Sequence, residues 1–403
     1  MFVQFWGVGL SAPSPLAMTP GDVSNHLVAD WIPSLPVSLS SSFIGWPPFL
    51  LETSPFDGYD VLTISQSAGR SERQWKSVLS WMLGVAGTRH VLVAEGYRWV
   101  APLSAFYPEA VQPVDLSLWN AAFPVGALVA TRSPGSRSRL RPDYIAVRPA
   151  HGGTSFDWAL VESKGTSRCL TNLATCPPPW YTQARNAAIS LHGAAQSVGR
   201  HLVIATRINP NGVRFSTRRL QVRAWNSAVE SDDRRLPAEA ALEVAAAHVF
   251  GFFRNLGLRE NARAIATSLW RRLGTQHKVR VFQGIEAESH ARLRQRAAVE
   301  LQERSQQRPD PIDKQEVVVV AIASELGRVE VEMSDALVGF AKRLQTAEEP
   351  SEAIVALREA DAELDRWESL RREHVASNVA VLPFGVQVRL PAGFKPRQRP
   401  ETE

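Results

Sequence analysis

The stretch "FDWALVESKGT", residues 156–166, decides the fold prediction because it joins a buried strand to a charged end. A mostly apolar run leads into Glu162 and Lys164, and a glycine follows. Side chains alternate faces along a strand, so Glu162 and Lys164 point to the same side as Trp158 and Leu160. A carboxylate and an amine at the end of an apolar face indicate either a solvated strand terminus or the edge of an active site.

A Gly-Gly pair upstream predicts how this strand is paired. The segment "PDYIAVRPAHGGTS" covers residues 142–155, and its two glycines suit a two-residue hairpin turn, which needs positive φ angles. With that turn, Ile145 lies opposite Leu160, and Asp143 lies opposite Glu162. Opposed Cβ atoms in such pairs are about 4.5–5.5 Å apart. We therefore expect two facing carboxylates, with Lys164 just beyond them on the same face.

Two facing carboxylates indicate a cation between them. They repel each other by about 0.2–1 kcal/mol, and a fold tolerates this most readily when a divalent cation separates them. Mg²⁺ often binds one or two carboxylates together with substrate phosphate oxygens, and a nearby lysine can hold the phosphate or the attacking water. The pattern thus predicts a site for Mg²⁺ or Mn²⁺ suited to phosphodiester hydrolysis. A decorative charged hairpin and a degenerate, non-catalytic copy of the site are the alternatives.

The succession "PDYIAV…FDWALVESKGT" resembles the PD-(D/E)xK, or restriction-endonuclease-like, nuclease superfamily. The resemblance implies an α/β fold (an α+β mixed sheet) with helix, three strands, helix and strand in that order. It also implies that Asp143 and Glu162 bind the metal, with the Ser163 carbonyl as a candidate further ligand. Lys164 would orient the attacking water and stabilise developing charge. Members often carry a Gln on the helix after this strand, and Gln183 matches that position.

Hydrophobic periodicity elsewhere in the first 235 residues predicts elements in that order. Helices are expected at 69–87 and 181–199, and strands at 1–10, 90–103, 126–132, 144–147, 201–206 and 213–225. An acidic residue of the first helix often assists in the superfamily, and Glu72 is the nearest candidate. An exposed Glu in a first helical turn is more often explained by the helix dipole.

Composition changes divide the chain into four regions. We expect an N-terminal strand-rich region at 1–60, a nuclease-like core at 61–235, a helical region at 236–305, and a C-terminal α/β region at 306–403 with a disordered tail. The last region contains an amphipathic helix at 351–374, whose apolar stripe should pack against its own domain or a partner. In the second case, the C-terminal helices would form a homodimer or bind a protein partner.

Arginines crowd the approach to Asp143. The candidate nucleic-acid-binding residues are Arg137, Arg139, Arg141 and Arg148. Binding to a phosphate backbone requires such a cationic loop because neutralised phosphates release counterions. A solvated basic loop is the alternative. Trp180 could stack on a base, although packing explains it more simply, and Arg218, Arg219 and Arg223 could extend the cationic surface.

The composition is that of an ordinary soluble protein with a formal net charge of +5, which is compatible with a polyanionic partner. Two cysteines, Cys169 and Cys176, indicate a reducing compartment, and their spacing does not suit a zinc site. The apolar N-terminus lacks a basic segment and favours a strand over a signal peptide. No apolar run reaches the roughly 20 residues of a membrane helix. We therefore expect a cytoplasmic protein that does not bind membranes.

Three functions fit this sequence. The first is a Mg²⁺- or Mn²⁺-dependent endonuclease acting on nucleic acid, with DNA favoured over RNA; the family likeness suggests prokaryotic defence or restriction. The second is a catalytically inactive, nuclease-like subunit that binds nucleic acid or supports an assembly. The third is an enzyme acting on nucleotides rather than polymers. Metal binding through Asp143 and Glu162 separates the first from the second.

Overall fold

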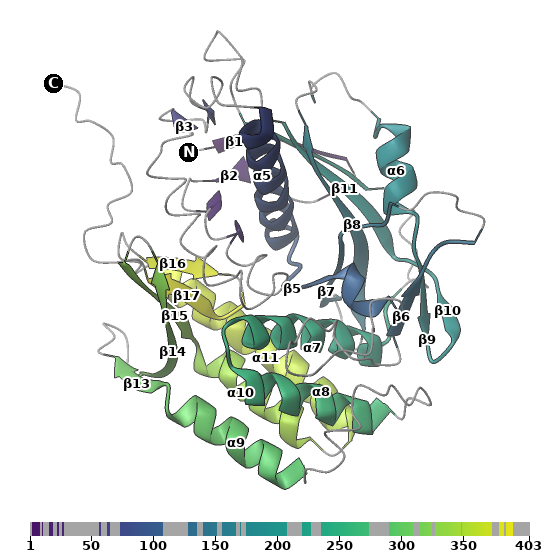
Figure 1. Cartoon of the computed structure of the whole chain (residues 1–403). Helices are drawn as coiled ribbons and strands as arrows, with labels where there is room; N and C mark the ends of the chain where they lie inside the picture. The colour runs from purple at the N-terminus through teal and green to yellow at the C-terminus, as the bar shows by residue number, and fades with distance from the viewer. Residues whose placement is uncertain are drawn as a thin grey trace, which may run out of the picture.

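The computed structural model (Figure 1) is a mixed α/β structure built around one large sheet. The structure describes residues 2–8, 10, 16–18, 22–23, 26–27, 56–57, 63–64, 73–107, 128–134, 140–150, 155–166, 170, 175–207, 220–226, 235–273, 290–308, 315–324, 327–347, 349–372, 379–382 and 384–389. Within these ranges the first two regions of the chain share the large sheet, because the first strand pairs with the last strand of the predicted core.

The large sheet has seven strands in the order β2-β1-β12-β11-β8-β7-β5. They are β1 (Phe2–Val8), β2 (Leu16–Ala17), β5 (Trp99–Pro102), β7 (Tyr144–Pro149), β8 (Phe156–Thr166), β11 (Arg200–Arg207) and β12 (Gln221–Asn226). β8 runs parallel to β11 and antiparallel to β7, so it joins the two halves of the sheet. Its residues from Trp158 to Glu162 are buried, which is the pattern of a central strand covered on both faces.

Helix α5 (Arg73–Ala94) covers one face of this sheet and packs on β8 and β11 (Figure 1). Two glycines allow the close approach, since a Cβ on Gly84 would come within 2.7 Å of the Gly165 main-chain nitrogen. A Cβ on Gly165 would in turn overlap the Ser80 carbonyl. Residues Ser77–Ala94 are long and apolar enough to cross a membrane, but 61% of that segment is buried in the fold. This helix is therefore accounted for as a core helix.

The opposite face of the sheet is covered by α6 (Pro178–Ala184) and α7 (Ala238–Asn255). The short 3-10 helix η1 (Leu103–Phe106) follows β5, and a three-stranded sheet lies beside it: β6 (Leu128–Thr131), β9 (Ala188–Leu191) and β10 (Ala194–Gln196). The two short strands β3 (Phe56–Asp57) and β4 (Thr63–Ile64) pair with each other. Lys164 donates a hydrogen bond to Gln183 of α6, so the charged end of β8 lies on the α6 face, away from α5.

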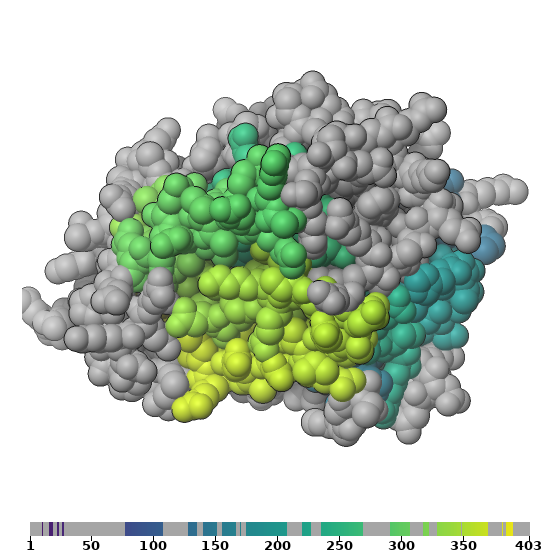
Figure 2. Space-filling view, turned by 90° about the horizontal axis from the view of Figure 1, so that it is seen from below, coloured from purple at the N-terminus to yellow at the C-terminus, as the bar shows by residue number. Residues whose placement is uncertain are grey.

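The C-terminal half combines helices with a second sheet. Its elements are α8 (Arg259–Leu273), α9 (His290–Gln302), β13 (Ser305–Arg308), β14 (Gln315–Ser324), β15 (Gly327–Met333), α10 (Asp335–Thr346), α11 (Pro350–Arg372), β16 (Val379–Leu382) and β17 (Val386–Arg389). These five strands form an antiparallel sheet in the order β13-β14-β15-β17-β16. Figure 2 shows α9, α10 and α11 across the lower face of the molecule. One apolar core joins this half to α7 and the large sheet.

Two predicted elements were wrong. Residues 90–94 were expected to begin a strand, but they form the last turn of α5. The helix predicted at 181–199 ends at Ala184, and a hairpin of β9 and β10 follows it. Ile189 and Leu191 are buried, whereas Ser190 between them is half-buried. Burial therefore alternates with the period of two that is typical of a strand, and not with the helical period of 3.6. Pairing with β6 and the left-handed turn at His192 and Gly193 overrides the helical composition.

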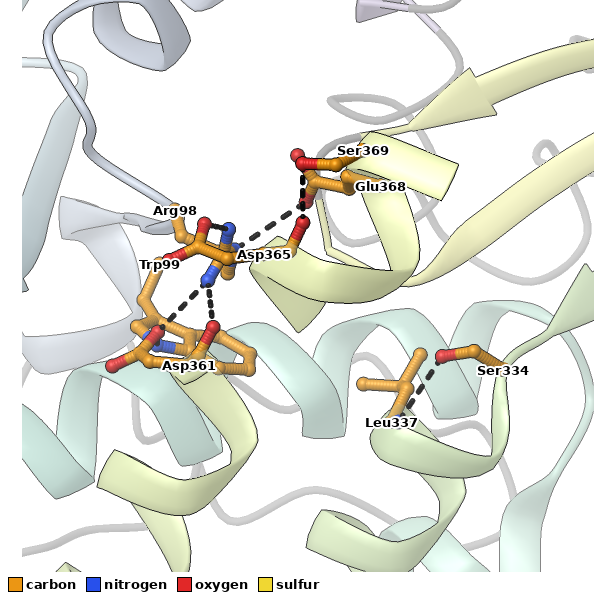
Figure 3. A network of polar contacts seen from close by, with 8 residues as sticks. All are labelled: Arg98, Trp99, Ser334, Leu337, Asp361, Asp365, Glu368 and Ser369. Carbon is orange, nitrogen blue, oxygen red and sulfur yellow. Dashed lines mark hydrogen bonds and ion pairs between the residues drawn. The ribbon is translucent and has the colours of Figure 1, made fainter. Parts of the chain in front are cut away.

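A buried ion cluster links the large sheet to α11 (Figure 3). Arg98, which precedes β5, lies 3.4 Å from an oxygen of Asp361 and 3.4 Å from one of Glu368, and it also pairs with the more exposed Asp365. The indole nitrogen of Trp99 donates to Asp361 Oδ1 at 2.8 Å. Burial raises the pKa of Asp361 to about 6, although the Arg98 charge opposes that rise. The guanidinium therefore compensates carboxylates that the fold has removed from water.

His248 on α7 is buried between the same two parts of the molecule. Its Nδ1 donates to the Val100 carbonyl at 2.8 Å, and its ring meets those of Trp99 and Phe384 edge to face. Burial, with a smaller effect of the Arg89 charge, lowers the pKa of His248 to about 3. The imidazole is therefore neutral in the folded protein at all but strongly acidic pH.

Arg98→Met should destabilise the protein by about 3–5 kcal/mol, because it leaves Asp361 and Glu368 buried without a cation. Asp365→Asn removes the exposed partner, whose side chain is 73% accessible, and should cost less than about 1 kcal/mol. Denaturant unfolding of both variants measures the difference. Equal effects would show that the cluster does not hold α11 to the sheet.

The contribution of His248 to the stability of the protein should fall as the pH drops from about 6.5 towards 3. The unfolded chain takes up a proton at His248 near pH 6.5, and the folded chain does so near 3, so acid favours unfolding by up to about 1.4 kcal/mol per pH unit. Asp361 and Glu162, whose pKa values are raised, act in the opposite direction. The His248 contribution is therefore read as the difference in pH dependence between the wild type and a variant without the imidazole. His248→Asn keeps a donor for Val100 and should remove this part of the pH dependence. An unchanged slope in denaturant unfolding would contradict the assignment.

Candidate metal and hydrolysis site

The hairpin of β7 and β8 brings the predicted carboxylates together. Ile145 pairs with Leu160 and Val147 with Trp158, so the predicted register is confirmed. The turn residues 151–154, on which that prediction rested, lie outside the described residues. Asp143 is exposed just before β7, and its main-chain NH donates to the Val161 carbonyl at 2.9 Å. Its Oδ2 accepts a hydrogen bond of 2.8 Å from the Ser163 NH, which fixes the carboxylate beside β8.

Glu162 is fully buried, and its ion-pair partner among the described residues is Lys164. In the described part of the structure no hydrogen-bond donor reaches Glu162 Oε2. Burial, and after it the charge of the nearby Asp143 carboxylate, raise the pKa of Glu162 to about 8, against the opposing effect of Lys164. A buried carboxylate that repels its neighbour and lacks donors is costly. A metal cation bound by both Glu162 and Asp143 would offset this cost.

Gln183 holds the lysine in place. The Nζ of Lys164 donates to Gln183 Oε1 at 2.8 Å, and Gln183 Nε2 donates to the Arg141 carbonyl at 2.9 Å. The amide is nearly buried on α6 and therefore joins β8 to the segment that leads into Asp143. Although α6 is shorter than predicted, it still places Gln183 at the site, because the helix packs on β8 and β11.

The donor set fits a hard cation. Asp143 and Glu162 offer carboxylate oxygens, which suit Mg²⁺ or Mn²⁺. The side chain of Ser163 accepts a hydrogen bond of 2.9 Å from Thr88 on the α5 face, so any contribution of Ser163 comes from its main-chain carbonyl. Within the described ranges, no group of three or more His, Cys, Asp or Glu residues could hold a metal. The remaining ligands would be carbonyl, water or phosphate oxygens, as is usual for Mg²⁺.

The predicted arginines lie in different surroundings. Arg137 and Arg139, like Glu72, are outside the described residues. Arg141 lies over the Tyr107 ring at 3.9 Å, beside the site. Arg148 stands towards the other end of β7 and pairs with Asp157 and Glu95. The guanidinium of Arg148 thus has partners within the fold, and its predicted role in binding nucleic acid gains no support from this position.

Two further sequence candidates have structural surroundings. Trp180 packs against Trp225 with ring centroids 6.0 Å apart, in line with a packing role. Cys176 is a free thiol, and burial raises its pKa to about 12. Cys169 lies outside the described residues. Tyr107, the support of Arg141, was missed because it follows β5 and has no motif of its own.

Comparisons of the chain with protein-family models, with curated proteins and with solved structures found no match.

Glu162→Gln should leave the metal-free protein equally stable or more stable by up to about 1 kcal/mol, because it removes the repulsion with Asp143. The same variant should lose any rise in melting temperature that Mn²⁺ or Mg²⁺ gives the wild type. Thermal unfolding with EDTA and with each metal measures both effects. Glu239→Gln, on α7 outside the site, is the matched control. A metal-induced rise that survives in Glu162→Gln would place the cation elsewhere.

Proposed function

We propose that the protein is a Mg²⁺- or Mn²⁺-dependent nuclease that hydrolyses phosphodiester bonds in nucleic acid, with DNA favoured. The observation that carries this proposal is the buried Glu162 facing Asp143, with Lys164 anchored beside them. A structural hairpin gains nothing from two repelling acids at a strand end. A hydrolytic site gains a place for a cation and a cationic group for the reacting phosphate.

The order of elements supports a restriction-endonuclease-like core. Helix α5 precedes the antiparallel strands β5, β7 and β8; α6 follows, and then β11 runs parallel to β8. This is the helix, three strands, helix, strand order that the motif resemblance implies, with β6 inserted before β7 and the hairpin of β9 and β10 inserted between α6 and β11. The candidate residues Asp143, Glu162, Lys164 and Gln183 lie at corresponding places in that order.

The proposed mechanism assigns each side chain a role. Asp143 and Glu162 hold the cation, which when bound would supply a Lewis acid for the phosphate and lower the pKa of a water molecule. Lys164 has a partly accessible ammonium group that positions the attacking water and stabilises charge developing on the phosphate oxygens. Gln183 restricts the lysine to one orientation through its hydrogen bond. Arg141, stacked on Tyr107, offers a cation to the substrate backbone.

The alternative function is an inactive, nuclease-like subunit that binds nucleic acid or supports an assembly. The ion pair between Lys164 and Glu162 favours it, because that pair compensates part of the buried charge without a metal. Metal binding separates the two functions. The proposed enzyme binds Mn²⁺ through Asp143 and Glu162, and a scaffold has no need to do so.

Cleavage of plasmid DNA, single-stranded DNA and RNA with Mg²⁺ or Mn²⁺ tests the proposal. Asp143→Ala and Lys164→Ala should each lower the rate by at least about 100-fold. Lys342→Ala, which removes an exposed lysine of α10, should leave the rate unchanged. Activity that survives in both site variants would refute the assignment, and salt-sensitive binding without cleavage by the wild type would favour the scaffold.

A further inference from the structure

Two arginines lie on the same face of the large sheet as Glu162 and Lys164. In the register of the parallel strands Lys164 is beside Ala205, and in the next antiparallel pair Ala205 is beside Arg223. Arg207 stands two residues further along β11, on the same face. Adjacent strands are about 4.8 Å apart, so the Cα atoms of Arg223 and Lys164 are roughly 10 Å apart. The two arginines therefore lie close to the site without belonging to it.

Neither guanidinium has a carboxylate within ion-pair distance in the part of the chain that the structure describes. Arg207 Nη1 donates to the Gln221 side chain at 3.1 Å, and Arg223 Nη1 donates to the Leu170 carbonyl at 3.1 Å. The Nε of each is buried without an acceptor among those residues. Arg98, Arg148 and Arg389 differ, because each of them is paired with an acid.

The adjoining sequence also lacks acids. Residues 167–176, which follow β8, and residues 208–220, which follow β11, contain no Asp or Glu. The same two segments contain four further arginines: Arg168, Arg214, Arg218 and Arg219. The segments that directly follow β8 and β11 in the sequence therefore carry positive charge and no negative charge.

A guanidinium stays charged at all ordinary pH, so covering it without an anion costs free energy. Arg223 is only 9% exposed, and its remaining donors match the oxygens of a phosphate, which it can bind in a fork geometry. An anion that binds both arginines would compensate this cost. An anion site requires guanidinium groups that no carboxylate neutralises, and Arg207 and Arg223 meet this requirement among the described residues.

We propose that Arg207 and Arg223 form an anion subsite that holds a backbone phosphate of the nucleic acid next to the phosphate that is cleaved. The assignment to nucleic acid rests on the proposed function, whereas the anion subsite itself does not. A second phosphate, bound two strands away from the lysine in the same sheet, selects a polymer over a mononucleotide. The subsite thus distinguishes a nuclease from an enzyme acting on free nucleotides.

Inorganic phosphate tests the subsite without any nucleic acid. Phosphate should raise the melting temperature of the wild type above its value in chloride of equal ionic strength. Arg207→Gln should lose this rise, and Arg223→Lys, which keeps the charge in a buried position, should show a smaller one. Arg343→Gln is the control, because Arg343 on α10 is already paired with Glu359 and Glu363. An equal rise in Arg207→Gln and the wild type would overturn the subsite, whatever the stability of Arg223→Lys.

Oligonucleotide binding in EDTA tests the assignment to nucleic acid, because no metal-dependent cleavage occurs there. Arg207→Gln should reduce the slope of log Kd against log salt by about 0.7–0.9, the value for one phosphate contact. A single neutral methylphosphonate linkage, moved along the oligonucleotide, should weaken wild-type binding at one position and leave Arg207→Gln unaffected there.

The outcomes of the two proposals are separable. If phosphate stabilises the protein through both arginines but the salt slope is unchanged, the assignment of the subsite to nucleic acid is overturned. If both arginine effects appear and the wild type cuts no substrate with metal, the subsite stands and the nuclease proposal fails.

Discussion

The close approach of α5 to β8 is the constraint on which the rest of the structure depends. Gly84 and Gly165 let the helix lie directly on the central strand, so α5 covers β8 and β11 on one face of the sheet. The charged side chains of β8, Glu162 and Lys164, lie on the other face, where the candidate site forms. Gly165, which follows the lysine in the motif, is explained by this packing and has no need of a role in catalysis.

The candidate site combines a stability cost with a functional arrangement. Glu162 is buried beside Asp143, and its pKa of about 8 expresses how poorly the metal-free fold solvates it. A chain of hydrogen bonds runs from Lys164 through Gln183 to the Arg141 carbonyl. It keeps the ammonium group of Lys164 at the edge of the candidate site. Fixed polar groups of this kind need no reorganisation during a reaction. Arg207 and Arg223, which have no carboxylate partner among the described residues, add two cationic groups on the same face of the sheet.

The C-terminal half is attached to the site-bearing sheet by burial as well as by charge. Arg98 and Trp99 meet Asp361 of α11, and His248 of α7 fills the space between Trp99 and Phe384. Since β5, β7 and β8 are adjacent strands, the helices that support β5 also stabilise the hairpin that carries Asp143. This arrangement joins the predicted helical and C-terminal regions to the core through one continuous apolar cluster.

The sequence by itself determined the register of β7 against β8 and brought Asp143 near Glu162, because side-chain alternation and a two-residue turn leave little freedom. It also predicted β11 and most C-terminal helices from local periodicity. Only the tertiary structure decided that α6 ends at Ala184, that β9 pairs with β6, and that Arg98 meets Asp361. Those features depend on contacts between residues far apart in the chain, whose energies no local pattern contains. For the same reason the unpaired state of Arg223 became visible only when its neighbours were in place.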